Sequence, residues 1–372
     1  MTDTALVVGG TRFIGRHTVE ELLAHDYEVA IFNRGNHENP FADDDRVTHV
    51  EGDRKDETAL RAAKLSVEPD VVIDCVAYQP ADVATATEIF ADVDGYVYIS
   101  SGSSYAAEEI PKREGETPLE PCTDEQAVDD AHETYGNRKA EGDRAVFAAA
   151  EEGVAATAVR PCIVYGPHDY TERLDYWIDR VLTHDRVVVP GDGQNLWHRA
   201  YVEDVASALR IVAERGEPGA AYNVGDRRAL TLRETLETIA DAAGVECEVV
   251  AASDDALAAG GLEPDDFVLY REYPHLLDTC ALADLGWEST PVDEAMERTV
   301  EEHRQSDRDG SEWDPGRAAE HRVIRVTETL LIASAPPRGP PASGRGVPPA
   351  RLRVAPAVPP PHPLSLVPSH AD

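Results

Sequence analysis

Lysine is nearly absent from this 372-residue chain, in which only four of the 34 lysines and arginines are lysines: Lys55, Lys64, Lys112 and Lys139. Positive charge as a whole is scarce, because 71 aspartates and glutamates give a formal net charge of -37. Such an acidic surface repels polyanions at ordinary salt concentrations. The sequence therefore disfavours nucleic acids and anionic membranes as partners.

Cysteines and long apolar runs are also few. The five cysteines are an odd number without C-x-x-C spacing, which argues against a disulfide framework and against a zinc site. No apolar run approaches the roughly 18 residues that a membrane span needs. The acidic N-terminus runs directly into an expected strand without a signal-peptide pattern. We therefore expect a cytoplasmic protein without a metal site.

The excess of acidic residues has its own interpretation. Together with the lack of lysine, it resembles the composition of proteins from halophiles that keep concentrated salt in the cytoplasm, where carboxylate-rich surfaces stay hydrated. Salt also screens the self-repulsion of such a surface. The composition thus indicates the solvent in which the protein works and says little about its activity.

The composition changes near residue 320. Residues 321–372 carry six arginines and two acids, and twelve prolines lie between positions 336 and 372. This segment has too little apolar surface to offset the entropy cost of ordering it. We therefore expect residues 311–372 to be a disordered tail, interpreted as a non-native extension; a polyproline ligand or a basic arm is the functional alternative. Only positions 323–332 are apolar enough for an edge strand or a short helix.

The N-terminal segment has the pattern of a nucleotide-binding unit. A short apolar strand at 5–8 is followed by a glycine turn, a helix to about residue 24 and a second strand at 28–32. Gly9, Gly10 and Gly15 fall where a tight turn, a close phosphate approach and a helix packed near the strand each exclude a side chain. The amides at the start of the helix then face a pyrophosphate.

The choice of cofactor is read from the end of the second strand. An NAD site usually places a carboxylate there to hold the ribose 2'-OH, but this chain has Asn33 and Arg34. Arg12 lies inside the glycine turn, and two arginines without a carboxylate suit a 2'-phosphate. The alternative is that both are surface arginines. We therefore favour NADP over NAD. By its order along the chain, Asp53 is expected to contact the adenine, and Ala77 is expected to lie under the cofactor.

At this point the chain resembles the extended short-chain dehydrogenase/reductases of the nucleotide-sugar epimerase/dehydratase type, over residues 4–303. The resemblance rests on "GGTRFIG", "YISSGSSYA", "YGNRK", "VRPCIVYGP", "GDGQNLWHRAYVEDVASAL", "AYNVG" and "LGWE" in family order. It implies a Rossmann-type α/β fold with a doubly wound parallel sheet at 1–160, joined by later segments, and a smaller substrate-binding lobe at 161–310. It also implies a small-molecule substrate such as a nucleotide sugar, and it allows a homodimer. The cofactor-binding residues would be Gly9, Gly10, Thr11, Arg12, Phe13, Ile14, Gly15, Asn33, Arg34, Asp53, Ala77 and Lys139.

The catalytic residues follow from the same motifs. Tyr135 and Lys139 are four residues apart on a predicted helix, so both side chains leave the same face. An ammonium near a phenol favours the phenolate, so we expect a lowered pKa for Tyr135. Counting four residues back from Tyr105, as the family pattern runs, gives Ser101 as the catalytic hydroxyl. The neighbouring serines 100, 103 and 104 are the alternatives.

Several family positions are changed in this sequence. The Asp-Glu pair that performs elimination in the sugar dehydratases is replaced by Gly102 and Ser103, so dehydration lacks its acid and base. The nucleotide-contacting Asn is Ile163, and the arginine that clamps the diphosphate is Trp197. The substrate-binding candidates are therefore Tyr165, Trp197, His198 and Arg199.

Two functions remain compatible with the sequence. The first is an NAD(P)-dependent epimerase or oxidoreductase that acts on a hydroxyl or keto group by Ser-Tyr-Lys chemistry. The second is a cofactor-binding or RNA-binding protein without catalysis, because "GGTRFIG" also resembles the chloroplast stem-loop RNA-binding branch of the superfamily. The intact Ser101, Tyr135 and Lys139 favour the enzyme.

Overall fold

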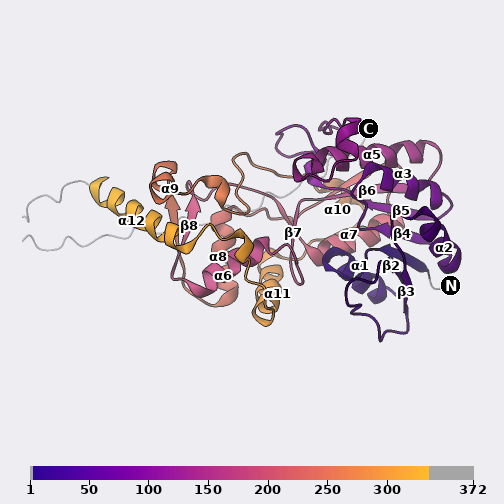
Figure 1. Ribbon diagram of the computed structural model, residues 1–372, viewed down its shortest axis with the longest axis horizontal. Coiled ribbons are helices and arrows are strands. Elements are labelled where there is room, and N and C mark those ends of the chain that lie inside the picture. The colour runs from indigo at the N-terminus through magenta and orange to yellow at the C-terminus, as the bar shows by residue number, and fades with distance from the viewer. Residues whose placement is uncertain (1–2, 335–372) are drawn as a thin grey trace, which may run out of the picture.

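The larger lobe is built on a parallel sheet of seven strands in the order β10-β6-β5-β4-β1-β2-β3. This lobe lies at the right of Figure 1, which draws the computed structural model; residues 3–334 are described. The central strands β4, β5 and β6 are buried along their whole length and β1, β2 and β10 except at their ends, as in a sheet covered by helices on both faces, whereas the edge strand β3 is partly exposed. The strands are β1 Thr4–Val8, β2 Glu28–Asn33, β3 Val47–Glu51, β4 Val71–Asp74, β5 Gly95–Ile99, β6 Ala156–Pro161 and β10 Ala221–Val224.

Successive side chains of a strand point to opposite faces of the sheet, so they pack against different helical layers. In β1, Ala5 and Val7 join one hydrophobic core with α1 and α7, whereas Leu6 and Val8 join a second core with α2, α3 and α5. The predicted doubly wound α/β fold is thereby confirmed. The helices are α1 Phe13–Ala24, α2 Glu57–Val67, α3 Pro80–Ile89, α5 Tyr135–Glu151 and α7 Val202–Arg215.

The smaller lobe surrounds a parallel pair of strands, β8 and β11. A second short parallel pair, β7 and β9, lies between the two lobes in Figure 1. Both ends of α8 are capped: Thr231 forms a capping box with Glu234, and Gly244 ends the helix with a φ of 67°. The elements are β7 Ile163–Tyr165, β8 Arg186–Pro190, β9 Arg199–Tyr201, β11 Glu248–Ala252, α6 Arg173–Thr183, α8 Leu232–Ala243, α9 Asp254–Gly260 and α11 Val292–Gln305.

Short elements complete the chain. The α-helical turns α4 Asp124–Ala127 and α10 Cys280–Asp284 lie in the connections, together with the 3-10 turns η1 Gly102–Ser104, η2 His132–Thr134, η3 Pro264–Asp266 and η4 Ser311–Trp313. The turn η1 matters for function, because it follows directly on the carboxyl end of β5. Residues 202–224, which form α7 and β10, return from the smaller lobe to the larger one.

The expectation of disorder from residue 311 onward is wrong for residues 311–334. This segment contains helix α12, Arg317–Ser334, which packs against α9, β11 and β8. Val323 is fully buried there, and a Cβ on Gly260 of α9 would lie 2.3 Å from it, so the glycine permits the close approach. Glu320, 1% exposed, pairs with Arg180 and Arg317. The proline-rich part of the expected tail lies outside the described residues.

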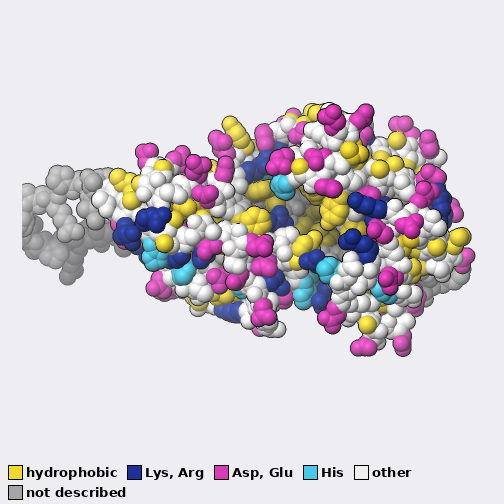
Figure 2. Space-filling view, viewed as in Figure 1, with side chains coloured by type: hydrophobic (Ala, Val, Ile, Leu, Met, Phe, Trp, Pro, Cys, Tyr) yellow, Lys and Arg dark blue, Asp and Glu magenta, His cyan; other side chains and the backbone are white. Residues whose placement is uncertain are grey.

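Acidic side chains are spread over the face shown in Figure 2, in keeping with the net charge, whereas hydrophobic and basic side chains gather in a hollow between the lobes. None of the helices within residues 3–334 is both long enough and apolar enough to cross a membrane. The hollow lies at the carboxyl ends of the sheet strands, where open α/β sheets bind their ligands.

Candidate active site

The glycine turn after β1 forms one wall of a cavity of about 720 Å³. Gly9 has a φ of 95°, and a Cβ there would lie 2.5 Å from Val76. A Cβ on Gly15 would lie 2.0 Å from the carbonyl oxygen of Gly9, so α1 can approach β1 only because residue 15 lacks a side chain. The turn therefore leaves a cradle of main chain at the start of α1, which fits a dinucleotide pyrophosphate.

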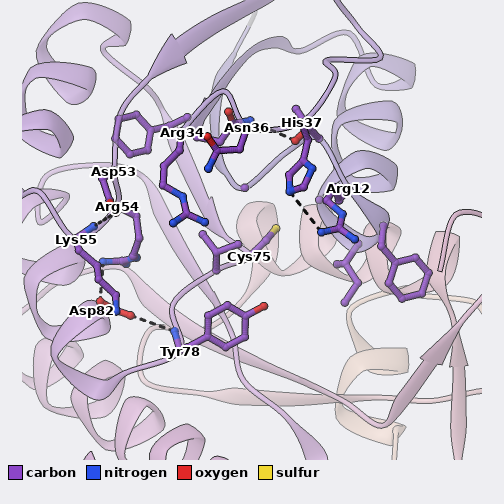
Figure 3. A pocket seen from close by; sticks show the side chains of 18 of the residues that line it. Arg12, Arg34, Asn36, His37, Asp53, Arg54, Lys55, Cys75, Tyr78 and Asp82 are labelled. Carbon is purple, nitrogen blue, oxygen red and sulfur yellow. Dashed lines mark hydrogen bonds and ion pairs between the residues drawn. The ribbon is translucent and has the colours of Figure 1, made fainter. Parts of the chain in front are cut away.

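Two arginines extend into this cavity. In Figure 3 the side chain of Arg34 projects between the Asp53–Lys55 segment on one side and Arg12 with His37 on the other. Arg12 lies 3.4 Å from the ring of His37 and its guanidinium carbon lies 3.7 Å from the centre of the Tyr170 ring. Neither arginine has a carboxylate within ion-pair distance among the described residues. Both charges are thus free for an anionic ligand.

Asn33 shapes the same edge of the cavity. Its side-chain amide donates to the Thr11 hydroxyl at 3.3 Å, and its carbonyl oxygen accepts from the Gly35 amide at 2.8 Å. Asn33 stands where an NAD site has a carboxylate for the ribose 2'-OH. In this protein its side chain instead stabilises the turn that carries Arg34. Asp53 also lines the cavity, and its carboxylate accepts from the Lys55 amide at 2.9 Å.

Most of the predicted cofactor residues line this cavity, and three do not: Gly10, Ala77 and Lys139, the last of which lines an adjoining cavity. Gly9, Thr11, Arg12, Phe13, Ile14, Gly15, Asn33, Arg34 and Asp53 line it. Gly10 lies behind the turn, where a Cβ would meet Val19 and Ile31 at 3.0 and 3.1 Å, so its role is packing. Ala77 is fully buried, and its neighbours Val76 and Tyr78 form the wall instead.

The predicted catalytic residues meet at a second cavity that adjoins the first. Ser101, Tyr135 and Lys139 line it together, and Tyr135 lines both cavities. Ser101 follows β5, whereas Tyr135 and Lys139 lie on the first two turns of α5, as their spacing predicted. A Cβ on Gly136 would lie 2.4 Å from the carbonyl oxygen of Ser103, so this glycine lets α5 approach the serine turn.

Lys139 is 2% exposed and its ammonium group is held by main-chain carbonyls. Its Nζ donates to the oxygens of Ala77 at 2.9 Å and Ile99 at 2.7 Å. An ammonium group has three donors, so one remains for a ligand. Burial lowers the pKa of Lys139 to about 8, and the charges of Asp74 and Asp143 oppose that shift.

The expected lowering of the Tyr135 pKa does not occur in the protein without a bound ligand. Burial raises the pKa of Tyr135 above its usual value, and a hydrogen bond with Ser101 and the charge of Arg173 act in the opposite direction. The prediction considered only the ammonium of Lys139, which lies 5.8 Å from the centre of the Tyr135 ring. Desolvation of the phenolate outweighs that attraction.

Ser101 is also the serine that the geometry favours. Its hydroxyl accepts from the Ser103 amide at 3.1 Å and reaches Tyr135. Ser104 is fully buried and absent from the cavity wall, whereas Ser100, 1% exposed, sits deeper beside Asp143. Ser103 lines the same cavity, but among the four serines only Ser101 is hydrogen-bonded to the Tyr135 phenol.

A buried network behind α5 was not foreseen from the sequence. Asp143, one helical turn after Lys139, accepts from Arg160 Nε at 2.9 Å, and both side chains are buried. Arg160 also donates to the Tyr105 hydroxyl at 2.9 Å, which in turn donates to Asn223 at 2.8 Å. The network joins α5, β6 and β10 beneath the catalytic residues and fixes the helix that carries them.

Only one of the four predicted substrate residues lines the second cavity. Trp197 does so. Tyr165 is 2% exposed and packs against Tyr201, with ring centres 5.8 Å apart. Arg199, 5% exposed, points into the core and donates to the Leu230 carbonyl at 3.0 Å and to Thr235. His198 is 2% exposed and bonded through both ring nitrogens.

These corrections share one cause. Successive side chains of a strand point to opposite sides. Because β7 and β9 lie between the two lobes, side chains on both sides of these strands are buried in the core. The positions that the sequence suggested as replacements for a diphosphate clamp therefore hold the lobes together. No clamp of that kind is formed by His198 or Arg199.

Other residues line the second cavity without having been predicted. Arg173 begins α6, and its Nε donates to the Thr171 hydroxyl at 3.0 Å. Arg271 and His275 come from the loop before α10, and Glu108 and Tyr170 from loops elsewhere in the chain. These residues have no shared motif or spacing, so no sequence signal indicated them. Within residues 3–334, no group of His, Cys, Asp and Glu side chains is arranged to hold a metal ion.

A seven-stranded parallel sheet, a glycine turn at the end of β1 and a Ser-Tyr-Lys set beside it define an extended short-chain dehydrogenase/reductase. The chain belongs to the NAD dependent epimerase/dehydratase family, whose model matches residues 5–225. The description of that family names NAD-dependent epimerases and dehydratases.

Relatives with known names give two comparisons. The chain is 26% identical over 258 residues to the chloroplast stem-loop binding protein of 41 kDa b of Arabidopsis thaliana, covering 66% of this chain and 65% of that protein. It is 28% identical over 313 residues to the low-salt glycan biosynthesis protein Agl12 of Haloferax volcanii, covering 76% and 92%. This chain thus spans about two thirds of the length of the chloroplast protein.

Solved structures show the same fold. The dTDP-glucose 4,6-dehydratase of Bacillus anthracis in complex with NAD matches with a TM-score of 0.66 and 19% identity, covering 84% of this chain and 98% of that one. The UDP-glucose 4-epimerase of Thermotoga maritima with UDP-glucose matches with a TM-score of 0.65 and 22% identity, covering 81% and 99%. At these identities the likeness establishes the fold.

Proposed function

We propose that this protein is an NADP(H)-dependent epimerase or oxidoreductase that acts on a hydroxyl or keto group of a nucleotide sugar or a related small molecule. One observation carries the proposal: Ser101, Tyr135 and Lys139 line one cavity, which adjoins the cradle formed by the glycine turn. A binding protein would not need a phenol, a hydroxyl and a buried ammonium at this junction.

The residues divide the proton and hydride chemistry between them. A nicotinamide dinucleotide bound in the first cavity supplies the hydride acceptor for alcohol oxidation and the hydride donor for the reverse reaction. Ser101 holds the reacting oxygen, and Tyr135 takes the hydroxyl proton during oxidation and returns it during reduction. Lys139 keeps one donor free for a cofactor hydroxyl and places a positive charge behind the phenol.

The preference for NADP(H) rests on Arg12 and Arg34. Both line the cavity, both lack a carboxylate partner among the described residues, and Asn33 stands where an NAD site has an acidic residue. In a chain with twice as many acids as cations, two arginines that line one cavity without an acidic partner support an anionic ligand there. A 2'-phosphate is an anion of the right size for a guanidinium fork.

The proposal extends to the working environment and the substrate. The acidic, lysine-poor composition and the similarity to a Haloferax volcanii protein support an enzyme of haloarchaeal type that works in concentrated salt. Names such as dTDP-glucose 4,6-dehydratase and UDP-glucose 4-epimerase among similar proteins support a nucleotide sugar. Because Gly102 and Ser103 carry no acid or base for elimination, the proposed chemistry stops at oxidation, reduction or epimerisation.

The test measures binding and turnover separately. Purified full-length protein in high salt is titrated with NADPH and NADH by fluorescence. Net reduction of NADP⁺ and formation of the epimerised sugar are then followed with UDP-glucose, dTDP-glucose and related nucleotide sugars. The proposal predicts tighter binding of NADPH and a turnover that Tyr135→Phe abolishes. Cofactor binding without turnover of any nucleotide sugar or free sugar would contradict the catalytic part.

The similarity to the chloroplast stem-loop binding protein keeps a second candidate in view, namely binding of RNA on the same fold. Acidic side chains are scattered over the face shown in Figure 2, and counterion-driven RNA binding needs clustered cations. RNA binding in a filter assay that persists at high salt and leaves cofactor binding unchanged would favour this candidate over the enzyme.

A further inference from the structure

The loop that runs from Arg271 to His275 forms part of the second cavity, which we call the substrate cavity. Its polar groups are not used by the Ser-Tyr-Lys chemistry. The loop is fixed by main-chain pairing, because the His275 amide donates to the Leu196 carbonyl at 2.9 Å and its carbonyl accepts from the His198 amide at 2.8 Å. His275 is 4% exposed. The main-chain pairing therefore fixes the position of His275 in the cavity wall.

The hydrogen bonds of His275 determine its tautomer. Nε2 lies 3.2 Å from the carbonyl oxygen of Gly102, which can only accept, so Nε2 carries the proton. Burial lowers the pKa of His275 to about 4, so the ring is neutral near pH 7. Nδ1 is therefore a hydrogen-bond acceptor. It is buried and has no partner within residues 3–334.

His198 provides an internal comparison. It is equally buried, its pKa is also lowered by burial to about 4, and it belongs to the same pairing of loops. Its Nε2 bonds to the Asp226 carbonyl at 2.8 Å, and its Nδ1 accepts from the Leu277 amide at 3.2 Å. Both nitrogens of His198 are thus satisfied by the protein. In His275 only one of them is, although a buried acceptor without a donor destabilises the fold.

A complementary group lies four residues earlier in the same loop. Arg271 donates through Nη2 to Glu108 at 2.6 Å, and its guanidinium carbon lies 5.6 Å from the centre of the Trp197 ring. Its Nε–H is buried and also lacks a partner within residues 3–334. The loop thus offers one unused donor and one unused acceptor at a cavity wall. Hydroxyl groups both donate and accept, so a ligand with several hydroxyls can satisfy both atoms.

We propose that Arg271 and His275 bind the hydroxylated part of the substrate, with His275 Nδ1 accepting a hydrogen bond from a hydroxyl and Arg271 Nε donating one. The proposal rests on the proposed function and adds to it the position of the sugar. Glycine at position 102 allows this arrangement, because a Cβ there would lie 3.0 Å from Cε1 of His275. The ring therefore takes the space beside Ser101 that a larger residue would fill.

Two substitutions separate the two nitrogens of His275. His275→Gln keeps an amide donor near Nε2 for Gly102 and removes the acceptor at Nδ1, whereas His275→Asn keeps an acceptor near Nδ1 and loses the donor. We expect kcat/KM with UDP-glucose or dTDP-glucose to fall at least about tenfold in His275→Gln, with NADPH affinity and Tm little changed. His275→Asn is expected to lower Tm and to retain most of kcat/KM.

His198→Gln is the matched control, since it removes a satisfied acceptor. It should lower Tm and leave the ratio of kcat/KM for UDP-glucose and its deoxy analogues unchanged. In the wild type that ratio should favour the intact sugar, and in His275→Gln the discrimination at one hydroxyl should disappear. If His275→Gln keeps full kcat/KM, or if both His275 variants lose it in proportion to Tm, the proposal is wrong.

A second measurement needs no turnover. In the full-length protein labelled with ¹⁵N-histidine, the neutral ring of His275 should be protonated on Nε2, and addition of UDP-glucose to the NADP⁺-saturated protein should shift the Nδ1 resonance. Protonation on Nδ1, or an unmoved resonance because a buried water already satisfies it, would overturn the inference. Absence of turnover in the wild type together with a shifted Nδ1 resonance would instead contradict the proposed reaction.

Discussion

The two adjoining cavities are built in different ways. The first cavity, beside the glycine turn, is the proposed cofactor cavity. Most of the residues in its wall follow the ends of strands β1 to β4 and lie within the first 78 residues. The wall of the substrate cavity is formed by segments scattered between Phe13 and His275. Several of its loops are held by isolated main-chain pairings, such as Trp197 with His275 and Lys112 with Leu277. Sites on strand ends follow from local sequence, whereas sites on paired loops depend on contacts between distant segments.

Removal of the proton-transfer group is expected to have the largest effect, because both cavities meet at Tyr135. Tyr135→Phe should lower the rate of hydride transfer by about 10²- to 10⁴-fold, with NADPH affinity unchanged. Stopped-flow absorbance of the cofactor measures the rate, and Tyr27→Phe, distant from both cavities, is the control. If Tyr135→Phe keeps its activity, Tyr135 is not the proton-transfer group at the junction of the two cavities.

The same residue gives a pH dependence with a defined sign. Burial raises the pKa of Tyr135, so the phenolate needed as a base forms only as the pH rises. We expect kcat/KM for alcohol oxidation to increase toward alkaline pH, and the reverse reduction, which needs the protonated phenol, to be favoured at lower pH. A flat profile between pH 6 and about 10 would mean that proton transfer does not limit the rate.

Truncation after Gly310 tests how far the smaller lobe depends on distant segments. It removes the buried side chains of Val323 and Ile324, together with Glu320, the partner of Arg180. We expect the free energy of unfolding to fall by about 3–5 kcal/mol, at about 1.5–2.5 kcal/mol for each buried aliphatic side chain. Thermal and denaturant unfolding in high salt should be compared with a chain that ends at Ser334. Equal stability of the two chains would mean that α12 contributes nothing to the lobe.

Gly15→Ala tests the cofactor cavity in the same terms. Its Cβ would lie 2.0 Å from the Gly9 oxygen, so α1 must move away from β1, at a cost of about 1–3 kcal/mol. Tm and NADPH affinity should fall together, because the displaced helix carries the pyrophosphate cradle. Gly153→Ala is the control, since nothing lies within 4 Å of its Cβ and only its φ of 95° is unfavourable. If the NADPH affinity of Gly15→Ala is unchanged, the glycine turn does not contribute to cofactor binding.

Arg34→Ala should change cofactor choice. Loss of a charge-assisted bond to the 2'-phosphate is expected to weaken NADPH by about 1–3 kcal/mol and to leave NADH nearly unchanged. Fluorescence titration of both cofactors measures the difference, with Arg228→Ala, a surface arginine outside both cavities, as control. Equal weakening of the two cofactors would indicate NAD as the natural ligand.

The smallest expected effect concerns the junction of the lobes. Asp226 follows β10, and its carboxylate accepts from the Tyr201 amide at 3.0 Å. Burial raises its pKa to about 7, so between about pH 4 and pH 7 the folded protein holds a proton that the unfolded chain has released. Stability from this group is therefore present at low pH and is lost as the pH rises through 7.

Asp226→Asn removes that titration and keeps an oxygen for the Tyr201 amide. We expect the variant to lose less stability than the wild type between pH 5 and pH 8, by on the order of 1 kcal/mol. Chemical unfolding at the two pH values provides the measurement. Parallel losses in both proteins would show that Asp226 is ionised in the folded state at pH 5.

The sequence predicted those parts of the site whose geometry is local. The strand, turn and helix at residues 4–24 are confirmed, and so is the placement of Tyr135 and Lys139 on one helix. Each of these features depends on spacing within one element, because helix and strand periodicity determine which face a side chain takes.

Predictions failed where burial by a distant segment decided the outcome. His198 and Arg199 have polar side chains at the right sequence position for a substrate, but the second lobe covers them. Lys112 is 1% exposed and donates to the Ala107 carbonyl and to Glu108 within a loop, so a second lysine of this lysine-poor chain is structural. Helix α12 was missed because its charge and the following prolines masked a short apolar stripe that α9 covers.

The sequence by itself determined the sheet, the glycine cradle, the Ser-Tyr-Lys set and the acidic surface, since these depend on residue type and on spacing along the chain. Only the tertiary structure decided which of the polar residues near the site are free. Among residues 3–334, Arg271 Nε and His275 Nδ1 have no hydrogen-bond partner, whereas Arg199 and His198 are bonded within the protein. The reason is that a hydrogen-bonding group binds a ligand only if the fold leaves it without another partner, and that depends on residues far away in the sequence.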